Sequence, residues 1–213
     1  MKKLMLGNEA IARGVYEAGV TVATAYPGTP STEITENIAK YDEIYSEWAP
    51  NEKVALEVAI GASIGGARAV SAMKHVGLNV AADPLFTASY TGVNGGLVIF
   101  VADDPGMHSS QNEQDTRIIA RGAKVPVIEP SDSQECKDFT KEAFRISEEY
   151  DAPVIVRLTT RVSHSQGTVE LDDRENYELK PYVKNPAKYV MMPAMAKRRH
   201  VSVEERMAKL KEY

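Results

Sequence analysis

The segment VTVATAYPGTPSTEITENIAK, residues 20–40, decides the fold because it joins a short apolar run, a loop and a stretch of helical character. The apolar run ends at Ala25 and has the length and composition of a buried strand. The loop that follows carries two prolines, a glycine and several hydroxyl side chains, and the residues from Ser31 to Lys40 are typical of a helix. The segment therefore predicts a strand, a loop at its carboxyl end and then a helix.

Apolar runs of strand length alternate with longer helical segments up to about residue 158. We expect strands at residues 20–25, 43–48, 67–72, 96–102, 125–128 and 153–157, and helices at residues 8–17, 31–40, 53–65, 79–91, 113–122 and 132–150. This alternation is typical of crossover connections, which build a mostly parallel sheet with helices on both faces. The expected fold class is α/β, an open sheet that binds ligands at the carboxyl ends of its strands.

The composition is that of an ordinary globular protein, with 43% hydrophobic and 26% charged residues among 213. No apolar run approaches the roughly 18 residues of a membrane span, and the first residues lack the features of a signal peptide. We therefore expect a cytoplasmic protein without a membrane partner. The net charge of -5 provides no general attraction to nucleic acid.

Cys136 is the single cysteine of the sequence. One cysteine excludes an internal disulfide, a multi-cysteine zinc site and a four-cysteine iron–sulfur cluster held by these residues alone. It shares a helix face with Phe139, Ala143 and Ile146, so we expect a core position rather than a nucleophile. No metal ligands are expected in the chain.

The pattern changes after Arg157, and we expect residues 1–158 to form one domain and residues 159–213 an extension. Residues 159–193 are polar and rich in turn residues, which indicates a tail or linker. A helix is expected from Ser202, where Ser202 and Glu205 make a capping box, and the basic cluster AKRRH before it is interpreted as a solvated turn. This amphipathic helix would dock on a missing domain or another subunit.

Two positions allow both a structural and a functional interpretation. Thr29 and Pro30 would cap and begin the following helix, or belong to a ligand-binding loop. Glu52 precedes a helix of small apolar residues, where it would complement the helix dipole or face a ligand in a narrow groove. Glu57 lies off the alanine stripe of that helix, which favours an outer ion pair or an interface.

Four segments in order resemble a known family: GNEAIARGVYEAG (residues 7–19), AYPGTPSTEI (25–34), NEKVALEVAIGASIGGARA (51–69) and DDPGMHSSQNEQDTR (103–117). They resemble the N-terminal region of the alpha subunit of indolepyruvate ferredoxin oxidoreductases, which are thiamine diphosphate enzymes. The likeness continues through VKNPAKYVMMPAMAKRRH (183–200). The resemblance implies the Pyr-type domain, which binds the aminopyrimidine half of thiamine diphosphate.

The resemblance also implies roles for individual residues. Glu52 matches the family glutamate that hydrogen-bonds N1′ of the pyrimidine ring and activates the cofactor, and is therefore the expected catalytic residue. Thr29 is expected to bind the substrate carboxylate, and Gly28 to permit a close backbone approach. A helix of small apolar residues would keep water away from the proton shared by Glu52 and N1′.

Met73, Lys74 and His75 follow the third expected strand, where related enzymes line the cofactor cleft. Lys74 would orient a carboxylate or form a surface ion pair. His75 would shuttle a proton, or be a surface or helix-capping histidine. The segment Met107–Arg117 would close over the cleft or remain a solvated loop.

The sequence lacks the GDG motif that the superfamily uses for diphosphate and Mg²⁺, and it lacks cysteines for [4Fe-4S] clusters. The resemblance therefore implies half of an active site that is inactive in isolation. Its partners would be a diphosphate-binding domain or subunit, a beta subunit, ferredoxin, coenzyme A and an aryl 2-keto acid, in an oligomer. The implied reaction is oxidative decarboxylation to an aryl-acetyl-CoA. Alternatives are the Pyr subunit of a non-oxidative 2-keto acid decarboxylase and a non-catalytic assembly domain.

Overall fold

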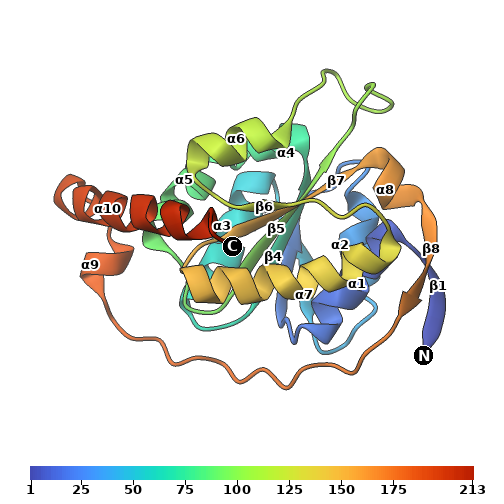
Figure 1. Cartoon of the computed structure of the whole chain (residues 1–213), viewed down its shortest axis with the longest axis horizontal. Coiled ribbons are helices and arrows are strands. Elements are labelled where there is room, and N and C mark those ends of the chain that lie inside the picture. Colours follow the sequence, from blue (N-terminus) through green and yellow to red (C-terminus); the bar gives the residue numbers. More distant parts are fainter.

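A computed structural model describes residues 1–213 and shows a six-stranded parallel sheet in the order β3-β2-β4-β5-β7-β6 (Figure 1). The strands are β2 (Val22–Ala25), β3 (Tyr45–Trp48), β4 (Ala69–Lys74), β5 (Leu97–Asp103), β6 (Val127–Ile128) and β7 (Val154–Thr159). Every neighbouring pair of this sheet is parallel. The predicted open parallel sheet is confirmed, and no strand boundary is displaced by more than two residues.

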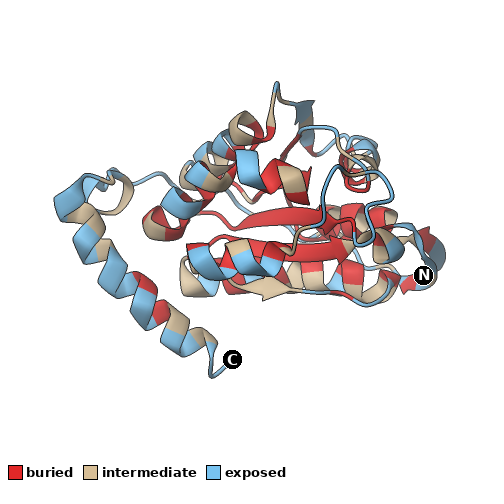
Figure 2. Ribbon diagram, turned by 90° about the horizontal axis from the view of Figure 1, so that it is seen from above, coloured by how far each residue is buried: buried red, intermediate tan, exposed pale blue.

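Helices cover both faces of the sheet: α1 (Gly7–Glu17), α2 (Thr32–Ile38) and α7 (Ser133–Tyr150) on one, α3 (Glu52–Ile64), α4 (His75–Val80), α5 (Ala82–Thr91) and α6 (Thr116–Ala123) on the other. Strand β5 shows why both layers are needed. Phe100 packs with the α1 and α7 cluster, whereas Ile99 and Val101 pack with the α3 to α6 cluster. Because side chains alternate along a strand, a strand that is apolar on both faces requires a helical layer on each. Figure 2 shows these strands buried between the helices.

Cys136 is fully buried in the core cluster beside α1, and burial raises the pKa of its thiol to about 12. The prediction of a core cysteine is confirmed, because a thiol that stays protonated is a poor nucleophile. None of the helices has the length and apolar character that a membrane crossing requires.

Two predictions about helix boundaries are wrong. The helix after β2 begins at Thr32, with Ser31 at its N-cap, so Thr29 and Pro30 do not start it. Residues 29–30 belong instead to a turn that Ser31 closes, through its backbone N–H and its hydroxyl, on the carbonyl of Gly28. The single helix expected at residues 79–91 is two helices, α4 and α5, and the first begins at His75.

Four short elements were not predicted from the sequence, because contacts with distant residues, and not local composition, define them. Strand β1 (Lys2–Leu6) pairs antiparallel with β8 (Gln166–Glu170), more than 150 residues away. The helices α8 (Thr160–His164) and α9 (Pro186–Tyr189) have only one turn or little more. A separate two-stranded sheet of this kind gains its stability from packing on the larger unit.

The C-terminal helix α10 spans Pro193–Leu210, so the predicted start at Ser202 and the solvated basic turn are both wrong. Proline occupies its first turn, where no hydrogen bond is lost, and the basic cluster forms helix. The helix packs on α5 of the same chain: Arg206 is buried and donates hydrogen bonds to the backbone carbonyls of Ser89 and Asp151. Val203 is fully buried as well, so the predicted apolar face exists and is covered within the chain.

Residues 171–182, here called the strap, run from β8 to α9 along the lower edge of the molecule in Figure 1. The strap is hydrogen-bonded along its length to the amino-terminal side of the sheet. Arg174 donates to the carbonyls of Tyr16 and Val20, and the Lys180 backbone N–H donates to Gly66. The polar composition of this segment predicted a linker. Hydrogen bonds to backbone carbonyls instead fix it to the rest of the chain.

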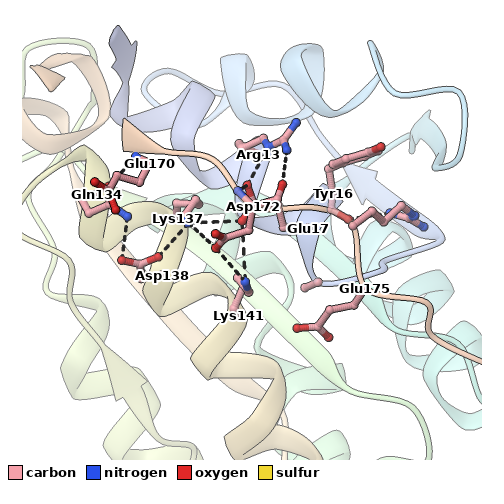
Figure 3. A network of polar contacts seen from close by, with 12 residues as sticks. Arg13, Tyr16, Glu17, Gln134, Lys137, Asp138, Lys141, Glu170, Asp172 and Glu175 are labelled. Atoms are coloured by element: carbon pink, nitrogen blue, oxygen red, sulfur yellow. Dashed lines mark hydrogen bonds and ion pairs between the residues drawn. The ribbon is translucent and has the colours of Figure 1, made fainter. Parts of the chain in front are cut away.

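Buried charges join the strap to α1 and α7 (Figure 3). Glu17 has no exposed side-chain surface; it accepts hydrogen bonds from Arg13 at 2.7 Å and from the Asp172 backbone at 2.8 Å. The buried ammonium of Lys137 lies 3.3 Å from Glu17 and 2.9 Å from the Asp172 carboxylate. Burial acts to lower the pKa of Lys137, but hydrogen bonds to Asp172 and Asp138 outweigh this and raise it.

Hydrogen bonds from Lys137 and then Lys141 lower the pKa of Asp172 to about 2. A carboxylate whose pKa is lowered by folding stabilises the protein above its unfolded pKa of about 4. This contribution is therefore present at neutral pH and is lost as the pH falls from about 4 to about 2.

Replacement of Lys137 by methionine should lower the free energy of unfolding by about 3 kcal/mol, because it leaves the buried Glu17 without its ammonium partner. Lys141→Met is the matched control: Lys141 is partly exposed and lies farther from Glu17, at 3.8 Å, so the expected loss is below about 1 kcal/mol. Urea denaturation of both variants measures the difference. Equal losses of unfolding free energy in the two variants would show that the buried Lys137 contributes no more to stability than the partly exposed Lys141.

Candidate functional site

The chain order of the strands marks the position of the site. From β2 the chain moves outward to β3 and then crosses back to β4, on the other side of β2. In open parallel sheets the loops diverge at such a switch point, and ligands bind there at the carboxyl ends of the strands. The loop after β2, the start of α3 and the residues after β4 meet at this edge, here called the switch-point site. It contains the turn at Gly28, Glu52 and the segment from Lys74.

Glu52 is the first residue of α3 and is 9% exposed. The helix is capped by the preceding residue, because the Asn51 side chain accepts a hydrogen bond from the Val54 N–H at 3.0 Å. The Glu52 carboxylate has neither a hydrogen bond nor an ion pair within the chain, although a buried carboxylate without a donor is costly. Glu52 lies in the first turn of α3, where the helix dipole favours a carboxylate, and its oxygens are unpaired.

Gly77 of α4 packs directly against the Glu52 carboxylate. A Cβ atom at position 77 would lie 2.6 Å from Oε1 of Glu52, which no real contact permits. A Cβ atom at this position would therefore have to displace the Glu52 side chain. The sequence did not identify Gly77; the signal was a glycine two residues after His75 in a helix.

Lys74, at the end of β4, lies over Gly28. A Cβ atom at position 28 would be 3.0 Å from Cδ of Lys74, so the missing side chain leaves room for the lysine stem. The Lys74 ammonium donates one hydrogen bond, to the carbonyl of Ser109 at 3.1 Å. No carboxylate lies within ion-pair distance of Lys74, so the alternative of a surface ion pair is wrong. The side chain is 9% exposed, and two of its three donors are unused.

The loop after β2 is held in one shape by the Gly28 backbone. Its N–H donates to the Thr32 hydroxyl at 2.9 Å, and its carbonyl accepts from Ser31. Thr29 is exposed, and its carbonyl accepts a hydrogen bond from the Ser109 hydroxyl at 3.4 Å. The Thr29 hydroxyl has no partner in the chain.

His75 is 1% exposed, so the interpretation as a surface histidine is wrong. Its Nε2 lies 3.0 Å from the carbonyl of Asn112, and a carbonyl only accepts, so Nε2 carries the proton of this hydrogen bond. The buried Nδ1 has no partner. Met73 is fully buried in the apolar cluster with Leu56 and Leu78, where its side chain exposes no surface to a ligand.

The loop between β5 and α6, residues 104–115, reaches both Lys74 and His75 through its carbonyls. The sequence suggested it as a cover for the cleft but did not identify Asp104, its first residue, although two consecutive aspartates at a strand end were a signal. Burial acts to raise the pKa of Asp104, but hydrogen bonds from Ser109, Ser110 and Thr160 outweigh it and hold this pKa well below its usual range. Asp104 is therefore ionised at neutral pH.

The switch-point site thus combines a buried carboxylate without a donor, a cation with free donors and a threonine hydroxyl. Such a set accepts a hydrogen bond from a ring N–H and donates to an anion. Within the chain, no group of three or more histidine, cysteine, aspartate or glutamate side chains is arranged to hold a metal ion.

Residues 13–210 match the family model described as pyruvate flavodoxin/ferredoxin oxidoreductase, thiamine diphosphate-binding. The chain is 52% identical to indolepyruvate oxidoreductase subunit IorA of Pyrococcus horikoshii, over 99% of this chain and 34% of that protein. It is 48% identical to the same subunit of Archaeoglobus fulgidus, over 100% of this chain and 36% of that protein. The chain therefore spans about a third of the length of these relatives.

More distant similarity extends to other 2-oxo acid enzymes. The 2-oxoglutarate synthase subunit KorA of Methanothermobacter thermautotrophicus is 32% identical over 79% of this chain and 47% of that protein. Among solved structures, 2-oxoglutarate:ferredoxin oxidoreductase from Magnetococcus marinus superposes with a TM-score of 0.82 at 19% identity, covering 100% of this chain and 45% of that one. This structural likeness shows that the fold is shared.

Gly77→Ala should lower the free energy of unfolding by about 1–3 kcal/mol, because the added methyl group displaces the Glu52 carboxylate or separates α3 from α4. Gly61→Ala is the control within α3: its Cβ would meet nothing within 4 Å, and a helix-interior alanine should stabilise by about 0.5–1 kcal/mol. Chemical denaturation of both variants tests the opposite signs. A neutral Gly77→Ala variant would contradict the close packing on Glu52.

Proposed function

Because the chain belongs to the thiamine diphosphate-binding pyruvate flavodoxin/ferredoxin oxidoreductase family, we propose that it is the N-terminal Pyr domain of an indolepyruvate:ferredoxin oxidoreductase. The whole enzyme would convert an aryl 2-keto acid and coenzyme A to an aryl-acetyl-CoA, with electrons passing to ferredoxin. The observation that carries the proposal is the buried Glu52 carboxylate, which has no donor in the chain and lies at the switch point of the sheet. Relatives about 50% identical over almost the whole chain are named as indolepyruvate oxidoreductase subunits.

The residues at this edge fit the pyrimidine half of thiamine diphosphate. Glu52 offers an acceptor without a partner, and a ring nitrogen that carries or shares a proton is a suitable donor. Gly77 packs beside Glu52 without adding a Cβ atom to this edge. When bound, thiamine diphosphate supplies the nucleophilic carbon and the electron sink for decarboxylation.

Glu52 would hold a proton at N1′ of the pyrimidine ring. Two features of this chain support that role. The side chain is only 9% exposed, so little water competes for a proton shared with a weakly basic nitrogen. The position at the start of α3 is fixed by the Asn51 cap and by the Thr24 hydroxyl, which donates to the Ala55 carbonyl at 2.7 Å.

Lys74, Thr29 and Gly28 would hold the carboxylate of the 2-keto acid. Lys74 has unused donors and no acidic partner, Thr29 has a free hydroxyl, and Gly28 lets the backbone come close. His75 would act beside them, with its Nε2–H held by the Asn112 carbonyl and its Nδ1 free. Met73 would support this strand end from the core rather than touch a ligand.

The remaining parts of the enzyme would lie outside this chain, since it spans about a third of its relatives. We assign residues 1–158 to the Pyr-type unit and residues 159–213 to the extension that leads toward the next domain. The diphosphate and Mg²⁺ site, the [4Fe-4S] clusters and the contacts with coenzyme A and ferredoxin would belong to other domains or to a beta subunit. A cytoplasmic oligomer is the proposed setting.

Glu52→Gln should lower 2-keto acid-dependent reduction of ferredoxin or viologen by about 10²-fold or more, because an amide cannot hold the shared proton. The measurement uses the complete enzyme, assembled anaerobically with thiamine diphosphate and Mg²⁺, and indolepyruvate as substrate. Glu57→Gln is the matched control on the same helix. Glu57 is exposed, and its single ion pair, with Lys53 at 4.0 Å, is long, so activity should stay unchanged. Full activity of Glu52→Gln would refute the proposed function.

Lys74→Met should raise the KM for indolepyruvate by about tenfold or more, because a charge-assisted hydrogen bond to the carboxylate is lost. The expected change in kcat is smaller, since Glu52 and the cofactor are untouched. Lys53→Met, at an exposed ion pair with Asp83, serves as the control and should leave KM unchanged. An unchanged KM in Lys74→Met would place the carboxylate elsewhere.

A further inference from the structure

We infer that Asp104 is the positioning residue of this site: it shapes the loop of residues 104–115 so that the loop carbonyls hold Lys74 and His75 in their working orientations. The inference deepens the proposed function and rests on it. Asp104 touches neither Lys74 nor His75, and it acts on them through Ser109 and the loop backbone.

Asp104 is an anion without a cationic partner. It is 1% exposed, and its Oδ2 accepts hydrogen bonds from the Ser109 N–H at 2.8 Å and the Ser110 hydroxyl at 2.7 Å. Its Oδ1 accepts from the Thr160 hydroxyl at 2.8 Å, and Thr160 belongs to α8, directly after β7. One carboxylate therefore joins two loop residues to the rigid frame of the sheet. The lowered pKa keeps this carboxylate charged and these bonds charge-assisted.

Ser109 transmits the effect to Lys74 within a single residue. Its N–H is fixed by Asp104, and its carbonyl accepts the hydrogen bond of the Lys74 ammonium at 3.1 Å. Its hydroxyl lies 3.4 Å from both the Thr29 carbonyl and Asp104. The orientation of Ser109 thus sets the direction of the cation and contacts the loop after β2 at the same time.

His75 depends on the same loop three residues further on. The Asn112 carbonyl accepts from Nε2 of His75 and so keeps a proton on Nε2. Nδ1 has no partner in the chain. A loop released from Asp104 would free Nε2, and the ring would no longer be limited to one tautomer.

The far end of the loop has a separate anchor, so loss of Asp104 should not unfold the protein. Asp103 accepts hydrogen bonds from the Thr116 N–H at 3.1 Å and from the Arg157 guanidinium at 2.7 Å. These contacts hold the start of α6 against β7. Asp103 therefore holds α6 and β7 together at this edge, whereas the contacts of Asp104 fix the conformation of the loop.

Asp104→Ala tests the inference in the complete enzyme and in the 213-residue chain. The KM for indolepyruvate should rise about tenfold, while the affinity for thiamine diphosphate, measured by titration calorimetry, should change less than about twofold. Long-range ¹⁵N NMR of His75 should show the single Nε2–H tautomer in the wild type and a mixture in the variant. Amide exchange of Ser109 and Ser110 should accelerate.

Asp104→Asn is the conservative variant, since its amide oxygen still accepts from Ser109 and Ser110, and it should restore most of the KM and the single tautomer. Asp83→Ala removes an exposed carboxylate and should match the wild type. An unchanged His75 spectrum together with an unchanged KM in Asp104→Ala would overturn the inference, even if Glu52→Gln is inactive and the proposed function holds. A fully active Glu52→Gln enzyme would refute the proposed function, and the inferred role of Asp104 with it.

Discussion

Parallel pairing of β2 with β4 is the constraint on which the rest of this structure depends. Ala25 lies beside Ala72 in that pair, and both loops leave from the same edge of the sheet in opposite directions. The residues on β2 are small, and the Thr24 hydroxyl binds the Ala55 carbonyl, which draws α3 close to the strand. Because α3 is placed in this way, its first residue, Glu52, arrives at the carboxyl edge rather than in solvent. The contacts that hold α3 against β2 therefore also place Glu52 at the switch-point site.

Some buried charges in this molecule have an oppositely charged partner within the chain, and others have none. Glu17 is enclosed by Arg13, Lys137 and the Asp172 backbone, so its burial is compensated and joins three parts of the chain. Glu52 is screened almost as well but has no donor, and Lys74 has no acid. Glu52 and Lys74 therefore offer an acceptor and donors that the chain itself leaves unused, and these are the groups to which the proposed function assigns ligand binding.

Polar contacts order much of the chain beyond residue 158. The strap gains backbone hydrogen bonds with Glu17 and Gly66 and places Arg174 at the carbonyl end of α1. Asp151 then binds Lys188 of α9 at 2.8 Å and Arg199 of α10 at 2.9 Å, while Arg206 reaches its carbonyl. Each of these side-chain contacts pairs a charge with a carbonyl or an opposite charge. The course of α9 and α10 is consequently set by contacts with the rest of the chain.

The sequence by itself determined the alternation of strands and helices, the parallel sheet, the core position of Cys136 and the location of Glu52 at a helix start, because these follow from local period and composition. It also placed Gly28, Thr29, Lys74 and His75 at strand ends. Only the tertiary structure decided what depends on distant neighbours: the pairing of β1 with β8, the course of the strap, the start of α10 and the roles of Gly77 and Asp104. Those features rest on contacts between residues distant in sequence, such as Gly77 against Glu52 or Thr160 with Asp104, and no local pattern encodes such contacts.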